Sequence, residues 1–172
     1  MSTDSASILA YLDTITPESN VPELLFRIIF ENALKSQDYN IIEKMISKKF
    51  ICASFNDNFA IKFMLSYNIK DSGYEIIKLL LKDENVDLKN SGNILLYYTA
   101  SDNQIDLMKI LLNDSRIKNI NDRANNPLRS ACIKGHIEIV KLLLADKRSE
   151  PTLLNNLIFR SAVLHDNYEI VK

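Results

Sequence analysis

Two residues in this sequence have types and a spacing that could support nucleophilic catalysis. Cys132 and His136 stand four positions apart, and residues at that spacing share one face of a helix. A cysteine beside a base is a common nucleophile, but the base normally needs a third group that orients its ring, and we find no such group. Both residues also suit a packed helix and the turn after it. We therefore expect no catalytic residues and a Cys132 thiol that reacts slowly near neutral pH.

The sequence also lacks the motifs of a cofactor or metal site. It has no glycine-rich phosphate loop, no HExxH and no calcium loop with the required spacing. Cys52 and Cys132 are too few and too far apart for a disulfide framework or a zinc site, and His165 is interpreted as a surface residue. We expect a non-enzymatic protein without cofactor or metal, in the reducing cytoplasm of a cell.

Composition and charge argue against several classes of partner. The 172 residues include 47% hydrophobic residues and three glycines, and the net charge is −1, so no positive field attracts nucleic acid. We interpret the basic pairs Lys48-Lys49 and Lys147-Arg148 as solvated charges. No stretch approaches the roughly 20 apolar residues that span a membrane. These features predict a soluble monomer that binds neither nucleic acid nor membrane.

An amphipathic segment recurs along the chain. Its copies are YNIIEKMI, YEIIKLLL, IDLMKILL, IEIVKLLL and YEIVK, which begin at residues 39, 74, 105, 137 and 168. Each copy has the apolar spacing of a helix, and a second short apolar run precedes most copies, as NPLRSACIKG does at 126–135. A period a little above thirty residues predicts an all-α solenoid of stacked antiparallel helix pairs.

The segment NNPLRSACIKGHIEIVKLLLADKR resembles the ankyrin repeat, whose pattern has a TPLH-type helix start, a small residue, a Gly-His turn and an apolar second helix. Asn126 stands where threonine caps the first helix. The small position is held by Ala33, Ala131 and Ala162, but by Asn68 and Thr99 in the other copies. Residues that tolerate a left-handed backbone occupy the turns: Asn103, Gly135 and Asp166. We expect the connectors to be loops rather than hairpins.

The first sixty residues allow two interpretations. VPELLFRIIFENAL followed by ISKKF resembles an F-box, but the same residues also fit a first ankyrin copy. We predict a non-repeat cap at 1–22, a degenerate first repeat or F-box-like segment at 23–58, and ankyrin repeats at 59–172, four to five in all with the last truncated. A longer chain or a partner is expected to cover Ile158, Val163 and Ile170 on that last repeat.

The ankyrin resemblance implies a scaffold that binds another protein through a concave face and adjoining loops. In that register, the inward positions predicted to bind the partner are Tyr67, Asp71, Tyr98, Asp102, Ser130 and Lys134. Tyrosine is enriched at interface hot spots, although these rings could instead pack between repeats. The two aspartates favour a basic protein partner. The alternative function is a substrate receptor of a cullin ubiquitin ligase, in which the F-box-like segment would bind an adaptor.

Overall fold

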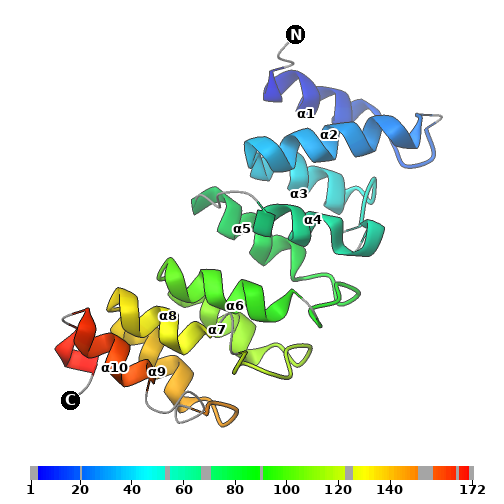
Figure 1. Cartoon of the computed structure of the whole chain (residues 1–172). Helices are drawn as coiled ribbons and strands as arrows, with labels where there is room; N and C mark the ends of the chain where they lie inside the picture. The colour runs from blue at the N-terminus through cyan, green and yellow to red at the C-terminus, as the bar shows by residue number, and fades with distance from the viewer. Residues whose placement is uncertain are drawn as a thin grey trace. The chain divides into compact units, whose positions relative to one another are not determined.

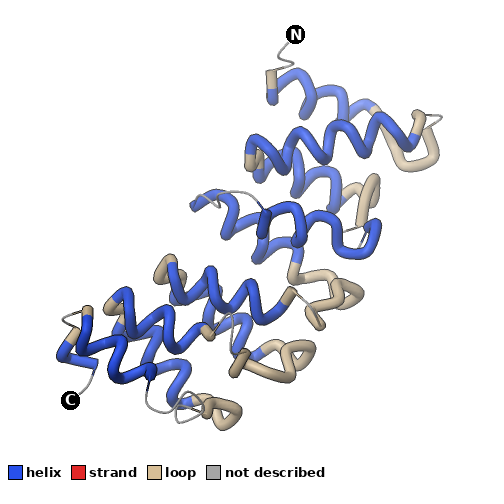
Figure 2. Tube along the Cα trace, in the orientation of Figure 1, coloured by secondary structure: helices blue, strands red, loops and turns tan. Residues whose placement is uncertain are grey.

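The computed structural model describes residues 4–19, 21–52, 55–66, 71–89, 91–122, 126–150, 157–165 and 167–170. Within these ranges all regular structure is helical, which confirms the predicted all-α architecture (Figure 2). The chain divides into two compact units, Met1–Asp87 and Leu88–Lys172, which we describe separately. The domain boundaries predicted at residues 22 and 58 remain predictions.

The described residues of the N-terminal unit form five helices, which are labelled in Figure 1. They are α1 (Ser5–Thr14), α2 (Glu23–Ser36), α3 (Tyr39–Ser47), α4 (Phe55–Ser66) and α5 (Asp71–Leu80). Helices α2 and α3 pack as one pair and α4 and α5 as the next, with α2 against α4 and α3 against α5. Helix α1 packs against α3. The unit therefore has one row of first helices and one row of second helices.

Helix α2 shows why these segments fold as pairs. Its buried side chains, Phe26, Phe30, Ala33 and Leu34, follow the helical period and form one apolar face. The ring of Phe26 stacks on Phe50 after α3, with centroids 4.7 Å apart. Burial of this face, rather than intrinsic helix propensity, supplies most of the stability of a helix of this length.

The C-terminal unit repeats the same arrangement. Its helices are α6 (Gly92–Ser101), α7 (Ile105–Asn113), α8 (Pro127–Lys134), α9 (Ile137–Ala145) and α10 (Leu157–Leu164), followed by the short 3₁₀ helix η1 (Tyr168–Ile170). Helices α6, α8 and α10 form the first-helix row, while α7 and α9 pack against each other in the second. Helix η1 contacts α9 and α10.

The predicted caps and turns are present in the described residues. The side chain of Asn126 caps α8 by accepting from the Arg129 backbone N–H at 2.9 Å. Gly135 and Asn103 adopt positive φ angles of 75° and 55°, and Asp166 lies outside the described residues. At the small position four side chains are buried, namely Ala33, Thr99, Ala131 and Ala162. Asn68 lies outside the described residues. The first-to-second-helix turn was thus predictable from residue type.

The connectors of the C-terminal unit are loops in the described residues, as predicted. Neighbouring loops are joined by Asn121, whose side chain donates to the Arg148 carbonyl and accepts from the Glu150 backbone N–H. At the end of the last repeat Val163 is exposed and Ile170 half-buried, while the Ile158 side chain lies outside the described residues. That these residues are covered by further chain or a partner remains a prediction.

Candidate functional site

Two of the six predicted binding residues belong to the N-terminal unit. Tyr67 lies outside the described residues. Asp71 was expected on the inward face of a first helix, and this is wrong, because α4 ends at Ser66 and Asp71 begins α5. In the described residues the second helix begins three residues upstream of its repeated motif, which starts at Tyr74. The side chain of Asp71 lies outside the described part of the chain.

Of the other four predicted residues, Tyr98 lies on α6 and Ser130 and Lys134 lie on α8, two helices of the C-terminal unit that pack against each other. Asp102 directly follows α6. A groove of about 230 Å³ runs between these helices, and its lining residues are Tyr97, Ser101, Asn126, Arg129, Ser130, Ile133 and Lys134. Ser130 and Lys134 therefore come together as the register predicted. Ser130 is only 7% exposed, so it forms part of the floor of the groove.

Tyr98 and Asp102 do not line this groove, and the residues one position earlier, Tyr97 and Ser101, do. Adjacent helical residues point about 100° apart, so a shift of one position changes the face that a side chain occupies. Tyr98 is still 37% exposed, and its ring meets that of Tyr97 edge-on, with centroids 5.5 Å apart. Asp102 is exposed and caps the C-terminal end of α6.

The groove between α6 and α8 is positively charged. Arg129 and Lys134 line it, and its lining includes no carboxylate among the residues that the structure describes. The Nε atom of Arg129 is buried and has no hydrogen-bond partner within the described residues. A buried donor without an acceptor lowers the stability of the fold, by about 1–3 kcal/mol.

The comparison with known families decides the class of this protein. Residues 49–155, well over half of the chain, match the family model described as ankyrin repeats (3 copies). The chain belongs to the ankyrin-repeat family. No curated protein and no solved structure matches the chain. These comparisons do not show the F-box resemblance of residues 21–50.

In this ankyrin fold Cys132 and His136 are structural residues. Cys132 is fully buried, and burial raises the pKa of its thiol to about 11, so the nucleophilic thiolate is scarce at neutral pH. The ring Nε2 of His136 lies 3.0 Å from the Ser101 carbonyl oxygen of the preceding repeat. Asn167 holds the equivalent place one repeat later, where its amide donates to the Cys132 and Ile133 carbonyls, each at 2.8 Å. The interpretation as packing and turn residues is confirmed.

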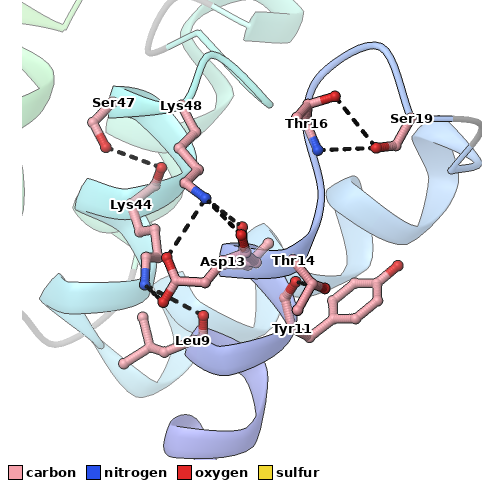
Figure 3. Close-up of polar contacts among 10 residues, drawn as sticks. Leu9, Tyr11, Asp13, Thr14, Thr16, Ser19, Lys44, Ser47 and Lys48 are labelled. Carbon is pink, nitrogen blue, oxygen red and sulfur yellow. Dashed lines mark hydrogen bonds and ion pairs between the residues drawn. The ribbon is translucent and has the colours of Figure 1, made fainter.

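Two basic residues interpreted as solvated charges are instead bonded across the ankyrin stack. In the N-terminal unit, the ammonium of Lys48 donates to the Leu12 carbonyl at 2.8 Å, at the end of α1 (Figure 3). Lys44 donates to the Leu9 carbonyl at 3.3 Å and to the Asp13 carboxylate at 2.6 Å. Both cations satisfy carbonyls at the negative end of the α1 dipole, so they hold α1 against α3.

In the C-terminal unit, Arg148 joins two ankyrin repeats. Its guanidinium donates to the carbonyls of Ile117 at 2.6 Å and Leu112 at 2.7 Å, and it pairs with Asp146. The sequence carries a signal that would have identified this residue, because Asp-x-Arg occurs both at 114–116 and at 146–148, one repeat apart. The prediction that Arg148 is a solvated charge is therefore wrong.

Neither a metal-ion site nor a membrane-spanning helix is found in the part of the chain that the structure describes. The described residues contain no group of three or more His, Cys, Asp or Glu side chains that could hold a metal ion. None of their helices is both long enough and apolar enough to cross a membrane.

Proposed function

We propose that this ankyrin-repeat protein is a non-catalytic scaffold that binds a protein partner through the groove between α6 and α8. Ankyrin repeats are generally protein–protein interaction modules. The observation that supports this particular surface is that two cations, Arg129 and Lys134, line the groove beside a tyrosine, Tyr97. Arginine and tyrosine are the residue types most often found at interface hot spots.

The proposed contact combines an aromatic surface with positive charge. A partner segment with one acidic side chain beside an apolar one would place its carboxylate near Arg129 and Lys134 and its apolar group against Tyr97 and Tyr98. Asp102, which lies outside the groove, would serve a basic group on the same partner, as the sequence predicts. The groove and Asp102 would therefore bind partner groups of opposite charge, so the two contacts can be tested separately.

A pair of matched charge reversals tests the proposal. We would compare partner recovery from cell lysate by the wild-type chain, Lys134→Glu in the groove, and Lys141→Glu on α9. Lys141 is also exposed but lies outside the groove. We expect Lys134→Glu to lower recovery of the same partner about tenfold and Lys141→Glu to leave it unchanged. Equal recovery by both variants, with helicity retained, would exclude the groove.

A second candidate function is that of a substrate receptor in a cullin ubiquitin ligase. The observation that favours it is an exposed apolar surface on α2, within the F-box-like residues 21–50: Leu24, Leu25 and Ile28. In this case wild-type chain should recover a cullin adaptor, and Leu24→Asp with Ile28→Asp should lose it. Recovery of no adaptor by the wild-type chain removes this candidate.

We also propose that the protein acts as a monomer in the reducing cytoplasm. Neither cysteine is part of a disulfide, and Cys132 is buried while Cys52 is exposed. An exposed reduced thiol suits a reducing compartment, because oxidising conditions would lead it to cross-link. Sedimentation of the purified chain under reducing conditions tests the monomeric state.

A further inference from the structure

Among the described helices of the N-terminal unit, one helix of the second-helix row, α1, has no counterpart in the first-helix row. Helix α1 packs against α3 in the way that α3 packs against α5, so α1 extends the row of second helices. Among the described helices of this unit, the first-helix row consists of α2 and α4 (Figure 1). Elsewhere in the chain each second helix is paired with a first helix, as α7 is with α6 and α9 with α8.

A groove of about 560 Å³ lies between α1 and α2, where a first helix paired with α1 would pack. Apolar side chains from both helices line it, notably Ile8 and Tyr11 from α1 and Leu25 and Ile28 from α2. Ile28 is 46% exposed, which is unusual for an isoleucine on a helix whose opposite face is core. This solvent-exposed surface is therefore apolar, like the surfaces that are buried between helices within the repeat stack.

We propose that this groove binds an amphipathic helix of a partner protein, which takes the first-helix position beside α1. The proposal depends on the N-terminal unit alone and is independent of the groove between α6 and α8. It follows from the continuity of the stack, because α2 would contact the incoming helix as α8 contacts α6 and α10. Binding of a helix in an apolar groove is a recurrent mode of peptide recognition.

The chain's own first helices indicate the sequence that such a helix needs. In three of them, α2, α6 and α8, the buried residues follow one pattern, in which a large apolar residue is followed three positions later by a small or short one and then by another buried residue. The examples are Phe30-Ala33-Leu34, Leu96-Thr99-Ala100 and Leu128-Ala131-Cys132. The small residue lets the two helix backbones approach closely. An incoming helix therefore carries a large residue and a small one at this spacing.

The length and charge of the groove limit the occupant further. The lining positions on α2 run from Leu25 to Ser36, which spans about 16 Å or three helical turns. Within the described part of the chain no lining residue is charged at neutral pH, and the polar ones include Asn32 and Ser36, near the C-terminal end of α2. A three-turn helix with an uncharged inner face fits this surface, and charged residues belong on its outer face.

The test uses a helical peptide with that pattern and the full chain. The probe is a fluorescein-labelled, hydrocarbon-stapled peptide of residues 92–103, GNILLYYTASDN, whose binding is followed by fluorescence anisotropy. The groove variant is Ile28→Asp. The matched control is Leu24→Asp, because Leu24 is on the same helix and 64% exposed but does not line the groove. Circular dichroism confirms that both variants keep their helicity.

We expect saturable binding that weakens about tenfold in Ile28→Asp and less than about twofold in Leu24→Asp. A peptide with Thr99→Phe, which places a large residue at the small position, should also bind at least about tenfold more weakly. Lys134→Glu in the chain should leave peptide binding unchanged, because Lys134 lies in the other groove. A failure of the peptide to bind can therefore be distinguished from a failure of the proposed scaffold function.

Three outcomes would overturn the proposal. The first is the absence of saturable binding up to about 1 mM peptide, which is the weakest affinity that such a site would need. The second is an equal loss of binding in Ile28→Asp and Leu24→Asp, which would indicate non-specific association. The third is a dimer in sedimentation experiments that Ile28→Asp dissociates, because a second copy of the chain would then cover the groove.

Discussion

Replacement of Arg148 should destabilise the C-terminal unit far more than replacement of its neighbour Lys147. Both are basic residues in the same loop, and from the sequence alone they are equivalent. In the structure Lys147 is exposed, whereas Arg148 donates to the carbonyls of Ile117 and Leu112 in the preceding repeat. Methionine at either position keeps an aliphatic stem and removes the charge, so Arg148→Met and Lys147→Met form a matched pair.

The expected magnitude follows from the bonds that each variant loses. Hydrogen bonds from a charged donor contribute about 1.5–3 kcal/mol each, and we use the lower end because the Arg148 side chain is 29% exposed. The two carbonyl bonds therefore represent about 3 kcal/mol. The ion pair with Asp146 is partly solvated and adds at most about 1 kcal/mol. Lys147→Met should change the free energy of unfolding by less than about 0.5 kcal/mol.

Urea denaturation followed by far-ultraviolet circular dichroism measures this difference. Hydrogen exchange of α7 and α9 would show that the loss lies in the C-terminal unit. The reasoning is refuted if Arg148→Met costs less than about 1 kcal/mol, or if Lys147→Met costs as much. Arg148→Lys should fall between the wild type and Arg148→Met, because one ammonium cannot reproduce the fork that reaches both carbonyls.

The same variant should alter the response to acid. The hydrogen bond from Arg148 lowers the pKa of Asp146 below its ordinary value of 3.8. A lowered pKa in the folded state means that Asp146 contributes stability above pH 3.8, and that this contribution is lost as the pH falls through the folded-state pKa. Wild-type chain should therefore lose more stability below about pH 4 than Arg148→Met does.

Three further predictions concern other positions. Thr99→Val should stabilise the chain by about 1 kcal/mol in urea denaturation, because the buried Thr99 hydroxyl has no hydrogen-bond partner in the described residues; no gain would show that the hydroxyl is satisfied. Joint replacement of Lys44 and Lys48 by methionine should speed amide exchange in α1 about tenfold, and unchanged exchange would refute their role in holding α1. A thiol reagent should label Cys52 quickly and Cys132 only after unfolding, and rapid labelling of both would contradict the burial of Cys132.

Much of the fold was predictable because ankyrin repeats depend on local signals. The recurring amphipathic segments indicated stacked helix pairs, and Asn126, Asn103 and Gly135 marked a cap and two turns. Each of these features arises within a few residues, where capping bonds, left-handed backbone conformations and helical periodicity depend on residue type. The placement of Asp71 failed because the start of α5 lies three residues before the repeated motif.

The sequence by itself determined the all-α repeat, its period and the packing role of Cys132. Only the tertiary structure decided that Tyr97 rather than Tyr98 lines the groove, and that Arg148 but not Lys147 bonds to the preceding repeat. It also decided that α1 belongs to the second-helix row and leaves the groove beside α2 open. The physical reason is that these features depend on contacts with residues some thirty positions away, or on the rotation of about 100° between adjacent helical positions. Local residue types specify neither of these.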